Sequence, residues 1–164
     1  MSAGVGTMRV HGTAVAVGPH AVLLRGPSGS GKSDLALRML ALPAEAVAMA
    51  FGHVLPVRLV ADDQIDIAVV DGEVTAGAPA TIAGLIEVRG VGVVSIGSAD
   101  GARVRLIADL LTSGSVERLP EPAAAVEFCG ISLPHLHVAA LEASAPLKVL
   151  LALARAVRTL DAVR

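Results

Sequence analysis

One eight-residue stretch near the start of the chain limits the possible folds more than any other feature. Gly26-Pro27-Ser28-Gly29-Ser30-Gly31-Lys32-Ser33 fits the pattern G-x-x-x-x-G-K-[ST]. A short apolar run at residues 21–24 precedes it, and residues 32–42 follow it with the periodicity of a helix. This pattern binds phosphate where a strand leads through the glycine-rich loop into a helix. The sequence therefore predicts an α/β protein with a phosphate-binding loop (P-loop).

The residue types in this loop suit the phosphates of a nucleotide. Glycines let successive backbone N–H groups point at one phosphate, and the N-terminus of the following helix adds a positive field. Lys32 is expected to bring a full charge to the β- and γ-phosphates, and Ser33 a hydroxyl ligand for Mg²⁺. The chain otherwise prefers arginine, whose planar fork does not replace a compact charge on a flexible stem. The loop predicts nucleotide binding, and the alternative is a Gly/Ser-rich turn with an exposed lysine.

The composition excludes several other classes of protein. With 164 residues, 54% of them apolar, and a net charge of −2, residues 1–164 are expected to form one domain that does not bind nucleic acid. Trp and Tyr are absent, which removes the usual base-stacking platforms. Charges and turn residues interrupt every long apolar run, so we expect a soluble cytoplasmic protein without a membrane span. The single cysteine, Cys129, is expected to be a small buried apolar side chain.

Beyond the loop, the patterning predicts more strands than helices. Strands are expected at residues 8–17, 58–61, 65–70, 73–76, 85–88, 93–96, 104–111, 124–128 and 133–141. Asp71-Gly72 predicts a hairpin turn, and residues 43–56 are either a loop or a short helix. A last helix is expected to begin with Ser144 as its cap and to carry Leu147, Leu150, Leu151 and Ala154 on one face. The fold class is therefore a mixed β-sheet core with few helices rather than repeated βαβ units.

Two carboxylates follow the apolar strand at residues 58–61. Phosphoryl transfer needs a ligand for Mg²⁺ and a group that takes the acceptor's proton, and Asp62 and Asp63 could divide these tasks. Neighbours in a regular strand point to opposite faces, so only one of them is expected to point at a given phosphate. The alternative is a solvated strand end.

Three further sites carry polar residues in apolar surroundings. Glu87 and Arg89 point to the same side of a strand, and they form either a surface ion pair or a metal ligand and a phosphate ligand. His11 lies on a strand that could neighbour the strand of the loop, although an isolated histidine is usually structural or exposed. His135 and His137 alternate on a strand, but no third metal ligand stands at a suggestive spacing.

Taken together, these pieces resemble the C-terminal catalytic domain of the HPr kinase/phosphorylase family. The resemblance covers residues 11–96 and rests on His11-Gly12, the loop, Ala61-Asp62-Asp63 and Leu85-Ile86-Glu87-Val88-Arg89-Gly90-Val91-Gly92. It implies a fold similar to that of phosphoenolpyruvate carboxykinases and assembly into a homo-hexamer. It also implies use of ATP and Mg²⁺ to phosphorylate a serine of HPr, the small phosphocarrier of the sugar phosphotransferase system. The reverse reaction uses inorganic phosphate and yields pyrophosphate.

The resemblance further implies a role for each matching residue. Lys32 would bind phosphates, and Ser33 and Glu87 would hold Mg²⁺. Asp63 would take the seryl proton, and His11 would help to position the reacting phosphate. Arg118, in Glu117-Arg118-Leu119, resembles the family's downstream catalytic arginine.

Three features depart from the family's pattern. We expect a short form without the N-terminal regulatory domain of longer members, and Gln64 stands where those often have arginine. Pro134-His135-Leu136-His137 replaces a Val-Pro-Val-x-x-Gly-Arg-Asn-like stretch that is tied to dephosphorylation, which leaves the reverse reaction open. Two alternative functions remain: an ATP-binding regulator without transfer activity, and a small-molecule kinase on the same fold. Because a pure sensor needs no catalytic base, Asp63 favours transfer over sensing.

Overall fold

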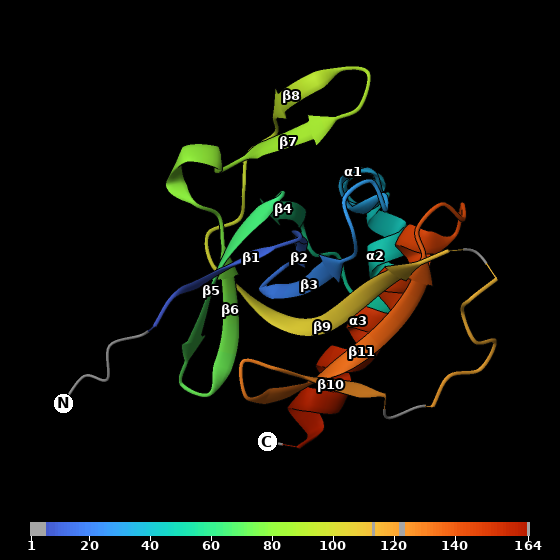
Figure 1. Cartoon of the computed structure of the whole chain (residues 1–164). Helices are drawn as coiled ribbons and strands as arrows, with labels where there is room; N and C mark the ends of the chain where they lie inside the picture. Colours follow the sequence, from blue (N-terminus) through green and yellow to red (C-terminus); the bar gives the residue numbers. More distant parts are fainter. Residues whose placement is uncertain (1–5, 113, 122–123, 164) are drawn as a thin grey trace.

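The computed structural model describes residues 6–112, 114–121 and 124–163, and within these a mixed sheet forms the centre of the molecule (Figure 1). Along the sheet the strands follow the order β1-β5-β6-β9-β3-β2-β4, while β11 pairs with both β9 and β10. The sheet strands are β1 (Met8–His11), β2 (Thr13–Val17), β3 (His20–Arg25), β4 (Val57–Ala61), β5 (Gln64–Val70), β6 (Glu73–Gly77), β9 (Ala102–Leu111), β10 (Ala125–Phe128) and β11 (Ile131–Ala139). The hairpin of β7 (Leu85–Val88) and β8 (Gly92–Ser95) stands apart from this sheet.

The helices are α1 (Lys32–Leu40), α2 (Ala44–Phe51) and α3 (Ala145–Ala162), with a short 3-10 turn at Ala80–Ile82. Together with the mixed sheet, they confirm the predicted fold class. Helix α1 follows the P-loop as predicted, and it buries Leu35, Ala36 and Met39 on one face. Burying a side chain the size of Leu35 contributes about 1.5–3 kcal/mol, so this face anchors the helix that carries the loop.

Strand directions bring the predicted site residues to one edge of the sheet. Strands β3, β9 and β11 are parallel to one another, whereas β2 is antiparallel to both of its neighbours, β3 and β4. Since β3 and β4 therefore run in the same direction, the residues that follow them emerge at the same edge. Strand β2 starts at this edge, where Thr13 pairs with Leu24 and Ala14 pairs with Ala61.

Two apolar layers hold the sheet in place, one on each face. Val15 and Val22 belong to the layer that packs against the helices, whereas Ala14 and Leu23 belong to the layer on the opposite face. This alternation follows the period of two of a β-strand, with both faces buried. The strands that precede the site are thus fixed from both sides.

Two sequence predictions about local structure are resolved in favour of regular elements. The segment at residues 43–56, expected to be a loop or a short helix, contains α2, with Pro43 at its N-terminal boundary. The Asp71-Gly72 hairpin between β5 and β6 is confirmed, with φ angles of 50° and 75° at its two turn residues. Positive φ at both positions suits the twist of antiparallel strands.

Three other local predictions are wrong. Cys129 is exposed rather than buried, because it lies in the turn between β10 and β11. In α3 the buried stripe passes through Val149 and Leu153, which leaves Leu151 47% exposed. Ser144 stands at the N-terminal boundary of α3, but its side chain makes no capping hydrogen bond.

No helix in the described part of the chain has the length and apolar character needed to cross a membrane.

Candidate active site

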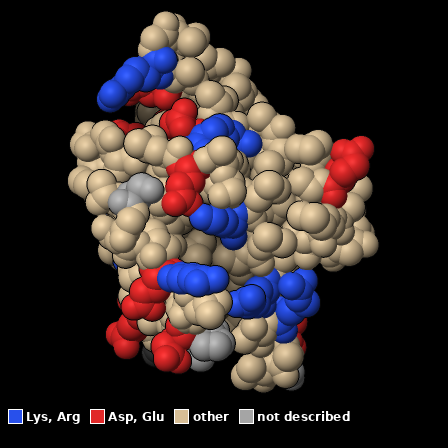
Figure 2. All heavy atoms as spheres, turned by 90° about the vertical axis from the view of Figure 1, so that its right-hand side faces the viewer, with Lys and Arg blue, Asp and Glu red and all other residues tan. Residues whose placement is uncertain are grey.

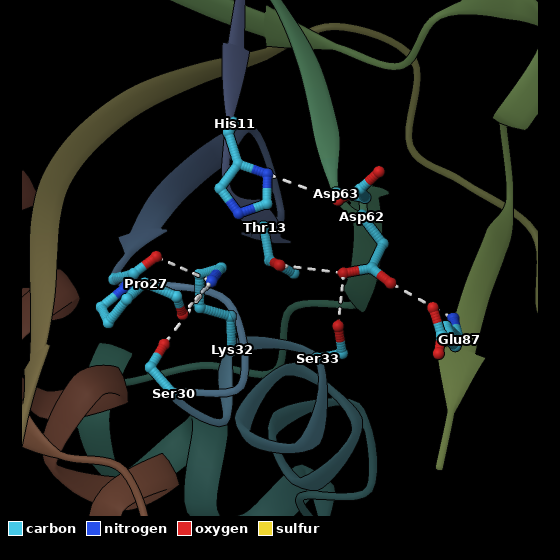
Figure 3. A network of polar contacts seen from close by, with 10 residues as sticks. His11, Thr13, Pro27, Ser30, Lys32, Ser33, Asp62, Asp63 and Glu87 are labelled. Carbon is cyan, nitrogen blue, oxygen red and sulfur yellow. Dashed lines mark hydrogen bonds and ion pairs between the residues drawn. The ribbon is translucent and has the colours of Figure 1, made fainter.

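The P-loop wraps around the ammonium group of Lys32 (Figure 3). Its Nζ donates hydrogen bonds of 2.8 Å to the carbonyl oxygens of both Gly26 and Pro27 and lies 3.5 Å from Ser30 Oγ. Burial lowers the pKa of Lys32, an effect that the charges of Asp62 and Asp63 oppose. The lysine is thus held inside the loop, and the charges of both predicted carboxylates act on it.

The backbone of the loop has the left-handed conformation that glycine allows. The φ angles of Gly29 and Gly31 are 78° and 97°, and Gly31 is the residue before the first turn of α1. A residue with a side chain is strained in this region, so backbone geometry favours glycine at position 29 and at Gly31, the second glycine of the motif. The loop thus leads directly into the positive end of the helix, as an anion-binding loop requires.

Asp62 is the centre of the polar network in Figure 3. Its Oδ1 accepts hydrogen bonds from Ser33 Oγ at 2.8 Å and from Thr13 Oγ1 at 2.9 Å, and its Oδ2 accepts one from the backbone N–H of Glu87 at 3.2 Å. The residue is 6% exposed. These donors come from α1, β2 and β7, so one carboxylate joins three separate elements.

Asp63 lies in a tight backbone turn directly after Asp62. Its φ angle is 70°, and the N–H of Gln64 donates to the carbonyl oxygen of Asp62 at 2.9 Å, which closes a three-residue γ-turn. The expectation that only one of the two acids would face a phosphate applied to a regular strand. Because β4 ends at Ala61 and the chain reverses, both carboxylates line the same cavity. Backbone strain of this kind is concentrated at functional sites.

His11 pairs with Asp63 at the mouth of the cavity. The two atoms, Nδ1 and Oδ1, lie 3.3 Å apart, and the side chains are 53% and 71% exposed. The expectation that the strand of His11 neighbours the strand of the loop is wrong, because β1 pairs with β5 while β2 pairs with β3. His11 is the last residue of β1, and only Gly12 separates it from Thr13, the first residue of β2.

The β7–β8 hairpin completes the cavity, which has a volume of about 390 Å³. Glu87 and Arg89 both line it together with the P-loop residues Ser28, Gly29, Gly31, Lys32 and Ser33. The placement favours the sequence hypothesis in which the two charged residues face bound phosphate and metal. Figure 3 shows Glu87 beside Asp62, on the side of the site opposite the P-loop lysine.

Arg118 is not brought to this cavity. It lies in the exposed segment between β9 and β10 and does not line the cavity in the described part of the chain. Its catalytic role stays a prediction from the resemblance.

Conversely, sequence reasoning missed Thr13, which is fully buried. The available signal was a polar residue that opens an otherwise apolar strand, Thr13-Ala14-Val15-Ala16-Val17.

Comparison with known families assigns the chain to a family. The family described as HPr Serine kinase C-terminal domain matches residues 5–161. The chain belongs to this family. The matched residues span the P-loop, both aspartates, the β7–β8 hairpin and all but the last residue of helix α3.

Curated relatives agree with this membership. The chain is 34% identical over 113 residues to a protein named HPr kinase/phosphorylase from Clostridium tetani. The aligned region covers 69% of this chain and 32% of the relative. It is 32% identical over 140 residues to a protein of the same name from Streptococcus uberis. This aligned region covers 79% of this chain and 41% of the relative. The chain thus spans less than half the length of these relatives.

A solved structure supports the fold of the domain. The structure of the Hpr(Ser) kinase/phosphatase from Coxiella burnetii superposes with a TM-score of 0.73 at 20% identity. The superposition covers 95% of this chain and 94% of that chain. At this identity the likeness shows the fold.

Proposed function

We propose that this domain transfers the γ-phosphoryl group of ATP, in the presence of Mg²⁺, to a serine hydroxyl of HPr. The observation that carries the proposal is that one cavity brings together the P-loop lysine, the buried Asp62 and the exposed His11–Asp63 pair. Phosphoryl transfer needs charge neutralisation, metal ligands and a proton acceptor in one place, and these residues supply all of them.

The nucleotide and the metal have matching groups in the site. Lys32 and the N-terminus of α1 would hold the phosphates. Ser33, Asp62 and Glu87 present hydroxyl and carboxylate oxygens, the ligands that Mg²⁺ prefers, on one side of the cavity. When bound, Mg²⁺ neutralises charge on the transferring phosphoryl group. Asp62 keeps Ser33 Oγ oriented through the hydrogen bond between them.

Asp63 is the proposed proton acceptor. Unlike Asp62, it is exposed, so its carboxylate can reach the hydroxyl of an incoming serine. His11 Nδ1 lies 3.3 Å from Oδ1 of this carboxylate and positions it. Because the seryl alkoxide develops only as transfer proceeds, most of the acceleration comes from alignment and charge rather than from strong basicity.

The exposure of the acceptor side of the site favours a protein substrate. Small-molecule sites bury most of their ligand. Here Asp63 is 71% exposed and His11 53%, which suits a serine presented on the surface of another protein. HPr is proposed as this partner because the relatives carry the name HPr kinase/phosphorylase.

The direct test is to incubate the protein with labelled ATP, Mg²⁺ and HPr from the same organism. We expect Mg²⁺-dependent phosphoserine on HPr, which is lost with Lys32→Met and with an HPr in which the acceptor serine is alanine. If ATP binds but no phosphoserine forms, the proposal fails and a nucleotide-binding regulator is favoured. Arg118→Ala in the same assay tests whether Arg118 takes part in transfer.

Two finer points belong to the same proposal. The reverse reaction is tested by supplying phospho-HPr with inorganic phosphate and assaying pyrophosphate. Assembly into a homo-oligomer, a hexamer by the resemblance, is tested by size-exclusion chromatography with light scattering.

A further inference from the structure

A second group of metal-ligating side chains lies outside the cavity, on the neighbouring strands β9 and β11. Asp109, His135 and His137 each offer one ligand atom, and these atoms all lie within 4.8 Å of one another. His135 Nε2 is 2.7 Å from Asp109 Oδ2, and the two imidazole rings meet edge to face with centroids 4.5 Å apart. None of the three lines the nucleotide cavity.

The strand geometry explains why these residues meet. His135 and His137 are two residues apart on β11, so they share one face of the sheet. In the parallel pairing of the two strands, His137 lies opposite Asp109. The third ligand is therefore supplied by tertiary structure, 26 residues before His135 in the chain, where a search for local spacing does not find it.

We infer that Asp109, His135 and His137 form a binding site for Zn²⁺ or a similar first-row transition metal. Two imidazole nitrogens and one carboxylate are a donor set that zinc takes, with a further position left for water. The proposed Mg²⁺ ligands at the P-loop are all oxygens, which magnesium prefers. The two groups of residues thus differ in chemistry as well as in place.

Arg25 supplies the outer support that metal-binding carboxylates usually have. Its Nε donates to Asp109 Oδ1 at 2.7 Å and its Nη2 donates to Oδ2 at 2.8 Å. Burial raises the pKa of Asp109, but the hydrogen bonds and charges of Arg25 and His135 together outweigh it and leave the pKa lowered. A carboxylate has about four lone-pair sites, so it can accept from Arg25 and still bind a metal.

The site is accessible to an ion from solution. His135 and Asp109 are partly exposed, with side-chain exposures of 16% and 27%, and His137 is exposed. A bound ion would join β9 to β11 next to the start of the P-loop, because Arg25 directly precedes Gly26. Metal binding at these three residues is independent of the proposed kinase activity.

The test uses the full chain without a polyhistidine tag, freed of metal with a chelator and titrated with Zn²⁺ in the presence of excess Mg²⁺. We expect one Zn²⁺ per chain, with affinity reduced at least about 100-fold in His137→Ala and in His135→Ala. The matched control is His53→Ala, which changes another exposed histidine and should bind Zn²⁺ as the wild type does. Circular dichroism checks that each variant is folded.

A second measurement locates the ion. Co²⁺ in place of Zn²⁺ should give visible ligand-field absorption that His137→Ala abolishes and His11→Ala retains. Absence of Zn²⁺ binding by the wild type, or equal binding by His137→Ala, overturns the inference. Loss of binding in His11→Ala alone would place the ion at the nucleotide cavity and overturn it as well.

Discussion

The hydroxyl of Thr13 donates a 2.9 Å hydrogen bond to Oδ1 of Asp62, and both side chains are buried. The same oxygen accepts the Ser33 hydroxyl at 2.8 Å, so Thr13 shares its acceptor with the P-loop helix. Thr13 therefore positions the carboxylate proposed to face the metal, and it lines the same cavity.

Thr13→Val keeps the shape of the side chain and removes its donor. Since a buried acceptor loses one partner, we expect the free energy of unfolding to fall by about 1–3 kcal/mol. Transfer to HPr should slow about tenfold, with a higher Mg²⁺ concentration needed for half-maximal rate. Thr13→Ser retains the hydroxyl and is the control, expected to restore the Mg²⁺ dependence. A normal Mg²⁺ dependence in Thr13→Val would show that the hydrogen bond is only structural.

The sequence predicted those parts of the fold that depend on interactions between residues close together in the chain. The P-loop, α1 and the Asp71-Gly72 hairpin follow from glycine placement, helical periodicity and turn chemistry. By contrast, the bond between Thr13 and Asp62 spans 49 residues, and pairing across strands brings these two together.

Contacts that depend on tertiary structure or on a turn also explain what the sequence missed at the candidate site and elsewhere in the chain. The position of Asp63 depends on a γ-turn that a strand pattern does not reveal. The placement of Asp109 beside His137 depends on the register of two parallel strands. Cys129 is exposed because of its place in a turn, although cysteine is most often buried.

The two neighbouring aspartates should separate into different roles on mutation. Asp63→Asn is expected to retain ATP binding and to lower the rate of transfer by about 10²–10⁴-fold, because it removes the proposed proton acceptor. Asp62→Asn should instead weaken Mg²⁺-dependent nucleotide binding, because it changes the carboxylate that holds Ser33. Equilibrium binding of ATP with and without Mg²⁺, together with initial transfer rates, distinguishes the two. If Asp63→Asn transfers at the normal rate, the assignment of the base is wrong.

Glu87 should matter through its charge at the cavity. Its side chain is exposed and lines the cavity, whereas its backbone N–H is already bonded to Asp62. Glu87→Gln keeps the size and the backbone contact, so we expect little change in stability and about a tenfold higher Mg²⁺ requirement for transfer. Glu127→Gln, at an exposed position of β10, loses the same charge away from the cavity and should behave as the wild type. An unchanged Mg²⁺ requirement in Glu87→Gln would remove Glu87 from the proposed metal ligands.

His20 should make the fold less stable in mild acid. Its ring stacks on Phe51, and its Nδ1 is buried without a hydrogen-bond partner among the described residues. Burial, reinforced by the charges of Arg105 and Arg103, lowers the pKa of His20 below 6.5 against the opposing effect of Asp161 and Glu73. Below the unfolded pKa the unfolded chain therefore binds a proton that the folded chain does not, and stability is lost as pH falls from about 6.5 towards the folded pKa.

His20→Gln removes this proton without removing the polar side chain, so the acid-dependent part of the stability loss should shrink. Urea unfolding at neutral pH and at several values below pH 6.5 measures the effect as the difference in slope between variant and wild type. His53→Gln, at an exposed histidine, serves as the control and should leave the slope unchanged. If His20→Gln and the wild type show equal slopes, protonation of His20 is not the cause of the stability loss in acid. Linkage requires the slope to change when a group with a shifted pKa is removed.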